Sequence, residues 1–162
     1  MSGQLISTEL DDARFQEAME LLQGLDGTEI FRQVADVYEA LTLERFQQQD
    51  SPDGVPWAPL SPVTLQRRQK RGIAGTAILR ETGLLRSTVR GTYGELTAGI
   101  TVGGPGSWAA VHQRGNPANT FGGAPAPIPA RPMIPEGDLP PRYIPRLLEP
   151  IEEALADALG GF

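Results

Sequence analysis

The sequence WAAVHQRGNPANTFGGAPAPIPARPMI, residues 108–134, organises our prediction of the fold. It begins with an apolar, helix-compatible hexapeptide at 108–113 that contains the only histidine, His112. A segment rich in Gly, Pro and Asn follows, and the stretch closes on Pro-Ala-Arg-Pro, which is stiff because proline restricts the backbone. We therefore predict a short helix, a long loop at 115–127 and a rigid extended segment. Loops of this length in a compact domain usually have a function or are disordered.

Two amphipathic helices are predicted upstream of this stretch. In residues 8–23 and again in 28–49, apolar side chains recur at three- and four-residue steps, which places them on one face of a helix. Thr8 can cap the first helix, and Thr28 or Asp26 can cap the second. The sequence Asp-Ser-Pro-Asp-Gly that follows is typical of a turn and should end the second helix.

A proline-rich connector and a short basic helix follow. Residues 55–60, VPWAPL, contain too much proline for a central strand, so we expect an extended segment anchored by the buried ring of Trp57. The next two residues, Ser-Pro, form a good helix start. The predicted helix at 62–71 should turn Val63 and Leu65 inward and its basic side chains outward. Those side chains are Arg67, Arg68, Lys70 and Arg71.

A β-hairpin and a final helix complete the predicted elements. Alternating residues in 85–89 and 96–102 indicate two antiparallel strands joined near 91–95. Residues 141–159 have helical spacing, and two internal prolines should interrupt or kink that helix.

The order of these elements predicts a single α+β domain over residues 1–162. It has N-terminal helices, a small and mostly antiparallel sheet with a β-hairpin, the long loop at 115–127 and a C-terminal helix. Residues 1–8 and 160–162 are expected to be frayed. At 162 residues, of which 40% are hydrophobic, the chain can bury one modest core.

The charges are segregated along the chain, whose formal net charge is −6. Residues 1–30 contain seven acids and one base, whereas residues 61–90 contain seven bases and one acid. The basic segment could bind nucleic acid, or it could pair with the acidic ends of the same chain or of a neighbouring copy. Because the total charge is acidic, we favour self-complementarity.

The absence of cysteine excludes disulfides, thiolate metal sites and a cysteine nucleophile. No run approaches the roughly 20 apolar residues of a membrane span. The N-terminal segment lacks the basic and apolar parts of a secretory signal. We therefore expect a soluble protein with no membrane partner.

Few residues could support catalysis or ligand binding. The sequence Gly-Gly-Pro-Gly at 103–106 lacks the Lys-Ser/Thr of a phosphate loop, and its proline removes an amide donor. A hydrolytic triad would need His112 with Ser87 or Ser107, but no nucleophile-elbow motif surrounds either serine. Adjacent carboxylates on the predicted helices point apart. We expect no catalytic residue, no cofactor and no metal ion.

Four residues are instead predicted to hold the structure together. The ring of His112 could orient the loop by hydrogen bonding to the backbone near Gly115 or Arg131. The rigid surroundings of Arg131 suit a fixed ion pair or a partner surface. Trp57 and Trp108 are expected to pack inward.

Four short motifs occur between residues 40 and 135. They are Phe46 with Asp-Gly-x-Pro-Trp-x-Pro-Leu at 53–60 and Thr64; Ile-Leu-x-x-Thr-Gly-x-Leu at 78–85 with Thr88; Ala-Val-His-Gln-x-Gly at 110–115; and Ile-Pro-Ala-Arg-Pro at 128–132. Together and in this order they resemble the phage virion-morphogenesis, or tail-completion, family of Mu-like and related contractile and siphophage tails.

The resemblance implies a non-enzymatic structural virion protein at the head–tail junction, where it would complete or terminate the tail tube. It implies assembly as a ring, commonly hexameric, so the partners would be further copies, the tail tube protein and the head–tail connector or stopper protein. The protein would be made in the host cytoplasm and located in the virion. A ring needs two different complementary faces, which oppositely charged segments can supply. DNA could pass through an acidic lumen without specific binding.

The interface of such a ring is expected at the basic helix and at the long loop. The candidate interface residues are Arg67, Arg68, Lys70, Arg71, Asn116, Asn119 and Phe121. The main alternative is a nucleic-acid-binding module that uses the basic 67–90 segment. A small hydrolase centred on His112 is a third hypothesis.

Overall fold

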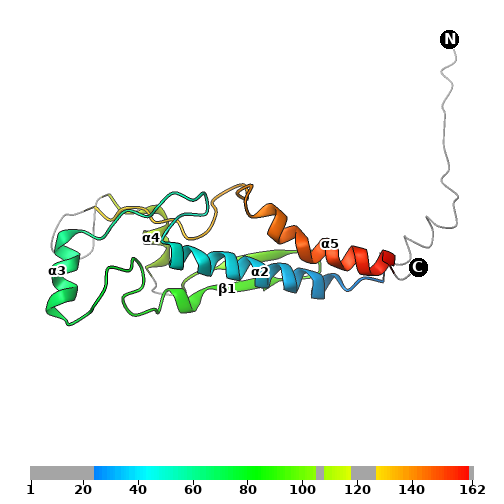
Figure 1. Cartoon of the computed structure of the whole chain (residues 1–162), viewed down its shortest axis with the longest axis horizontal. Helices are drawn as coiled ribbons and strands as arrows, with labels where there is room; N and C mark the ends of the chain where they lie inside the picture. Colours follow the sequence, from blue (N-terminus) through cyan, green and yellow to red (C-terminus); the bar gives the residue numbers. More distant parts are fainter. Residues whose placement is uncertain (1–23, 105–107, 118–126, 161–162) are drawn as a thin grey trace, which may run out of the picture.

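The computed structural model describes residues 24–104, 108–117 and 127–160, and these form the predicted α+β fold. The elements are α2 (Gly27–Gln48), α3 (Pro62–Lys70), the 3-10 helix η1 (Arg86–Thr88), β1 (Arg90–Tyr93), β2 (Ala98–Thr101), α4 (Ala109–Arg114) and α5 (Ile144–Gly160). The body is elongated: α2 runs through its middle, α3 lies at one end and the C-terminal part of α5 lies at the other (Figure 1). The helix predicted at 8–23 lies outside the described residues.

The central element is α2, which confirms the helix predicted at 28–49. The side chain of Asp26 caps it by accepting a 3.3 Å hydrogen bond from the backbone amide of Glu29. The helix ends at Gln49, which adopts a left-handed conformation with φ of 57°. From that position the backbone carbonyl of Gln49 accepts from the amide of Trp57, and its side chain accepts from the amide of Ile78. The end of α2 is therefore tied to two later segments.

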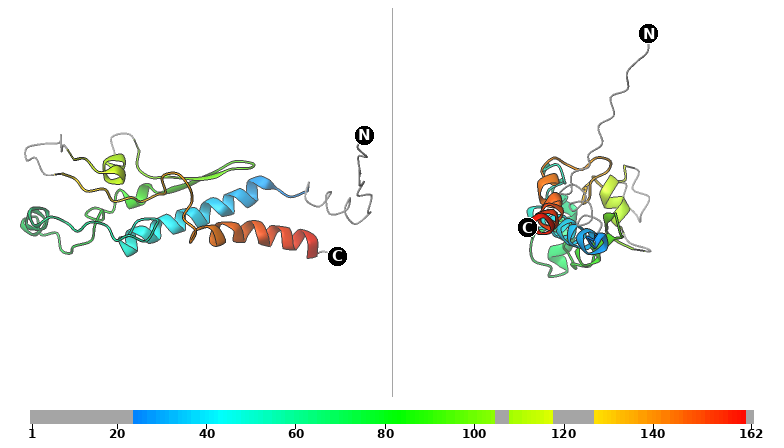
Figure 2. Two further views of the ribbon diagram at one scale, coloured as in Figure 1. Left: turned by 90° about the horizontal axis from the view of Figure 1, so that it is seen from above. Right: turned by 90° about the vertical axis from the view of Figure 1, so that its right-hand side faces the viewer.

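Helix α5 lies beside α2 in both views of the body (Figures 1 and 2). Between them lies a core cluster of Val34, Leu41, Tyr143 and Leu147. The rings of Tyr38 and Tyr143 meet edge to face, with centroids 6.2 Å apart. The helix starts three residues later than predicted, because residues 141–143 form a turn, and it continues through the buried Pro150.

The β-hairpin is present, but its first strand lies further along the chain than predicted. Strand β1 pairs with β2 in antiparallel register, Arg90 opposite Thr101 and Tyr93 opposite Ala98. The prediction of a strand at 85–89 is wrong. The hydroxyl groups of Ser87 and Thr88 donate back to the carbonyls of Leu84 and Leu85, which favours the tight 3-10 turn η1 over a strand. The turn of the hairpin is consequently at residues 94–97.

A second core cluster joins segments that are far apart in the sequence. Its buried members are Phe46, Trp57, Ile78, Val89, Ala109 and Met133. The rings of Phe46 and Trp57 meet edge to face at 5.6 Å. Only Phe46, Val89 and Ala109 are in or next to regular elements, so much of this core is built from extended and looped chain.

The geometry of α3 differs from the prediction in two respects. Val63 was expected to face inward but is 56% exposed, and Arg68 was expected to face outward but is buried. Helix α3 has no extensive contact with another described helix or strand, so no apolar core draws Val63 inward. Arg68 is instead covered by the segment that follows α3, to which it donates hydrogen bonds.

We predict that Gly91→Ala destabilises the fold because β1 approaches α2 closely at Gly91. A Cβ atom there would lie 2.6 Å from the backbone carbonyl oxygen of Ala35. Overpacking against a helix backbone should lower the free energy of unfolding by about 1–3 kcal/mol. Chemical denaturation checks this, with Gly104→Ala as the control because a Cβ atom at Gly104 would meet nothing within 4 Å. Equal stability of the two variants would contradict the prediction.

Candidate functional site

The motifs that carry the family resemblance converge on one region, where side chains hold proline-rich backbone together. The indole Nε1 of the buried Trp57 donates a 2.8 Å hydrogen bond to the carbonyl of Pro132. The ring of Trp57 is buried, and this bond attaches the 55–60 segment to the body. It also joins the 55–60 segment to the 127–135 segment, although they are more than 70 residues apart.

Arg131 makes the reciprocal connection from the second segment to the first. Its Nε donates to the carbonyl of Ala58 at 2.9 Å, and its Nη2 donates to the carbonyl of Pro59 at 3.1 Å. Burial lowers the pKa of Arg131. The partners of Arg131 are thus two backbone carbonyls, and the fixed ion pair considered for it is not found among the described residues.

Gln113 holds the following stretch against α4. Its side-chain oxygen accepts from the amide of Met133 at 2.8 Å, and its side-chain nitrogen donates to the carbonyl of Ile134 at 2.7 Å. A primary amide can satisfy a donor and an acceptor of extended backbone at once, as a neighbouring strand would. Sequence reasoning placed Gln113 in a motif but gave it no role.

The ends of the long loop are joined by a short antiparallel pairing. Asn116 and Ile128 exchange two backbone hydrogen bonds of 2.8 and 2.9 Å. The chain approaches itself closely at Gly115, where a Cβ atom would lie 2.8 Å from the carbonyl oxygen of Ile128. With φ of 75°, Gly115 also has a conformation that side chains disfavour. Glycine is therefore required at this position of the motif.

His112 contributes through its backbone rather than its ring. Its carbonyl accepts a 2.6 Å hydrogen bond from the amide of Arg131. The buried Nδ1 atom of the ring has no hydrogen-bond partner among the described residues, so the predicted ring hydrogen bond is absent there. Burial, with a smaller contribution from the charge of Arg131, lowers the pKa of His112 below its usual 6.5.

Trp108 does not pack inward as predicted. It precedes α4 and is 48% exposed, whereas the next residue, Ala109, is buried in the core cluster. The start of α4 thus presents a small side chain to the core, and the indole lies at the surface.

A second group of arginines braces the turn after α2, and sequence reasoning missed it. Arg45 is buried and contacts both carboxylate oxygens of Asp50, at 2.7 and 2.9 Å. Arg142 donates to the carbonyls of Ser51 and Pro52. The turn sequence at 50–54 could have indicated these arginines, because the carbonyls of a turn cannot all find hydrogen-bond donors within it and need donors from elsewhere.

The predicted interface residues are only partly brought together. Arg67 and Lys70 are exposed on α3 without a side-chain ion pair among the described residues. Arg71 pairs with Glu81 at 2.6 Å, and the outward orientation predicted for Arg68 is wrong. Asn116 lies at the base of the loop. Asn119 and Phe121 lie outside the described residues.

Within the described part of the chain, no His, Cys, Asp and Glu residues form a group that could hold a metal ion. One shallow hollow of about 140 Å³ lies against Gln113, Pro132 and Ile134. Another of about 270 Å³ lies against Leu60, Leu65 and Ile78. Among the described helices, none has both the length and the apolar character of a membrane span.

We predict that Gln113→Leu destabilises the protein although leucine has a similar volume. The substitution leaves the amide of Met133 and the carbonyl of Ile134 without their side-chain partner, which should cost about 1–3 kcal/mol. Thermal and chemical unfolding measure this. The control, Gln66→Leu, alters an exposed residue of α3 and should change stability by less than about 0.5 kcal/mol. A Gln113→Leu variant as stable as that control would refute the role of Gln113.

We also predict that stability falls as the pH is lowered from about 7.5 to 5.5. Because the pKa of His112 is lowered in the folded protein, the unfolded chain binds a proton near pH 6.5 before the folded protein does. The neutral ring therefore stabilises the fold above this range, and the contribution is lost as the pH falls. The chain has one histidine, so NMR titration of its ring reports on His112 alone, and denaturation at each pH, compared with a His112 variant, isolates its contribution to stability. In His112→Gln the free energy of unfolding should change less with pH in this window. An unchanged slope would contradict the attribution of this pH dependence to His112.

Comparison with known proteins agrees with the motif analysis. The sequence profile of the phage virion morphogenesis family matches residues 8–144, which is most of the chain. No curated protein and no solved structure matches significantly. The resemblance seen in the motifs is thus confirmed, and the chain belongs to the phage virion morphogenesis family of structural, non-enzymatic proteins.

Proposed function

We propose that this protein completes or terminates the phage tail tube by assembling as a ring at the head–tail junction. The ring would join the tail tube protein on one side to the head–tail connector or stopper protein on the other. Family membership supports a tail-related structural role in virion morphogenesis. The finer assignment rests on the shape and charge of the subunit.

The observation that carries the proposal is the opposite charge of the two ends of an elongated body (Figures 1 and 2). At one end, α3 and the segment after it contain six bases and one acid between residues 61 and 86. Toward the other end, residues 26–40, the hairpin turn and α5 together contain nine acids and two bases. A subunit with two different complementary ends favours head-to-tail association.

Head-to-tail contacts produce a closed ring when the rotation between neighbours closes, and otherwise an open filament. A six-fold ring would match the symmetry expected of the tail. The excess of acidic residues would discourage DNA from adhering to the lumen, because contacts with phosphates dominate protein–DNA affinity.

Nucleic-acid binding through the basic 67–90 segment is the second candidate function. Two observations reduce the available charge, however. Arg68 is buried against Glu81, and Arg71 is paired with the same carboxylate. Five bases of the 67–90 segment remain without an ion pair among the described residues: Arg67, Lys70, Arg80, Arg86 and Arg90. They would be available for the salt-dependent phosphate contacts typical of nucleic-acid-binding proteins.

The purified protein should form a species of six times the 17.4 kDa chain mass, alone or when mixed with tail tubes. Light scattering after size exclusion measures the mass, and electron microscopy locates the protein on the tubes. Raising the salt concentration should weaken association, because exposed charges are screened. A monomer in both conditions would overturn the ring. Salt-sensitive binding to DNA that is lost in Arg67→Ala/Lys70→Ala would instead favour the second candidate.

A further inference from the structure

Helix α3 projects from the body and is braced by its own flanking chain. It lies at the end of the molecule and makes no extensive contact with another described helix or strand (Figure 1). The buried Arg68 donates to Glu81 at 3.1 Å and to the carbonyl of Ala77 at 2.9 Å. Arg71 reaches the other oxygen of Glu81 at 2.6 Å. A projecting helix held in one orientation by hydrogen bonds and ion pairs to its flanking chain is suited to contact something outside its own chain.

The face of α3 opposite Arg68 has a defined composition. Val63, Arg67 and Lys70 follow each other at steps of four and three residues, so they lie on one stripe. Val63 is 56% exposed, and both basic residues are exposed without an ion pair among the described residues. This α3 stripe is about 10 Å long, at 1.5 Å per residue. It combines an apolar side chain with two free positive charges.

Helix α5 carries a stripe of matching character that α2 leaves uncovered. Leu148, Glu152 and Leu159 lie on one side of the helix, next to the face buried against α2. Leu148 is 41% exposed and Leu159 is 49% exposed. Glu149 and Glu152 are exposed, and neither has an ion pair in the part of the chain that the structure describes. Glu149 lies beside this side of the helix, three residues before Glu152, and we define the α5 stripe as Leu148, Glu149, Glu152 and Leu159.

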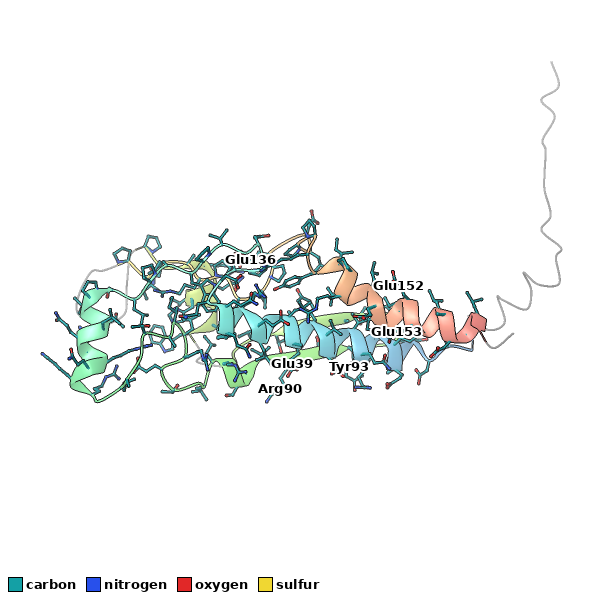
Figure 3. All side chains as sticks on the ribbon, viewed as in Figure 1. Glu39, Arg90, Tyr93, Glu136, Glu152 and Glu153 are labelled. Carbon is teal, nitrogen blue, oxygen red and sulfur yellow. The ribbon has the colours of Figure 1, made fainter. Side chains whose placement is uncertain are left out.

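The two stripes cannot meet within one subunit. Helix α3 lies at one end of the body, whereas Glu152 and its neighbours on α5 lie toward the opposite end (Figure 3). Burying exposed leucine and valine beside paired charges is favourable, because apolar burial adds affinity and complementary charge fixes the partner and its register. The missing partner of each stripe is thus present on another copy of the same chain.

We infer that the α3 stripe of one subunit docks on the α5 stripe of the next subunit. This inference rests on the proposed function, because it identifies the contact that propagates the ring. Val63 packs against Leu148 of the neighbour, and Arg67 and Lys70 pair with its Glu149 and Glu152. The contact is heterologous, so each subunit uses one stripe on each side.

A charge-exchange experiment tests the contact in the full-length chain. The Arg67→Glu/Lys70→Glu variant and the Glu149→Lys/Glu152→Lys variant each place like charges at the contact. Each should weaken self-association by about tenfold or more, measured by sedimentation velocity at low salt. Combining all four substitutions in one chain restores opposite charges, so self-association should return toward that of the unmodified protein. The control is Asp53→Lys/Asp138→Lys, which changes two exposed acids outside both stripes.

A second measurement uses the absence of native cysteine. The Val63→Cys/Leu148→Cys variant should give a ladder of covalent oligomers with a short bifunctional thiol reagent, because each linkage joins two copies. Each single-cysteine variant should stop at the dimer or remain monomeric. This measurement remains informative if the four-substitution chain fails to fold.

The outcomes separate the inference from the proposed function. Rings that assemble normally with reversed charges, or a missing ladder in a protein that assembles, would overturn the α3–α5 contact alone. Charge-dependent oligomers that do not bind tail tubes would support the contact and overturn the tail-completion role. A protein that stays monomeric under every condition would overturn both.

Discussion

The structure depends on side chains that satisfy the backbone carbonyls of proline-rich chain. The sequence contains 15 prolines and 19 glycines, so long stretches cannot form a helix or a sheet that would pair their own polar groups. A buried carbonyl without a donor is costly. Here the donors are arginine, glutamine and tryptophan side chains: Trp57 to Pro132, Arg131 to Ala58 and Pro59, Gln113 to Ile134, and Arg142 to Ser51 and Pro52. These bonds replace the ladder of a sheet and make the core around Trp57 and Met133 possible.

The same principle explains which features could be predicted from sequence. Helix α2 and the order of elements follow from local spacing and capping, because a helix satisfies its own backbone. The first strand was misplaced because Ser87 and Thr88 bond to nearby carbonyls, and alternation of apolar residues does not report that competition. Arg68 was placed outside because arginine is usually exposed. Its partner, the carbonyl of Ala77, becomes available only when the chain folds back on α3.

In the candidate site, too, some residues could be identified from the sequence, whereas their partners could not. The sequence predicts a structural role for Trp57 and Arg131, but it does not identify the groups to which they bind. Their partners lie more than 70 residues away and follow no local pattern. The roles of Gln113, Arg45 and Arg142 depend in the same way on carbonyl groups brought to them by tertiary structure. Trp108 was misassigned because its neighbour Ala109 fills the core position.

The interactions within the body leave several charges at its two ends without an ion pair among the described residues. Arg131 and Arg142 donate to backbone carbonyls, and Arg45 pairs with Asp50. Arg68 and Arg71 both pair with Glu81. These paired charges stabilise the subunit itself, whereas the charges without an ion pair among the described residues are available to a partner. No ion pair among the described residues involves Arg67 or Lys70 on α3 or Glu149 or Glu152 on α5. We therefore see no ion pair by which these four charges would stabilise the subunit. Because internal ion pairs already orient α3, a neighbour would not have to order that helix on binding, and more of the contact energy would appear as affinity. Under the proposed function, these preorganised and unpaired surfaces are the places where a neighbouring subunit would bind.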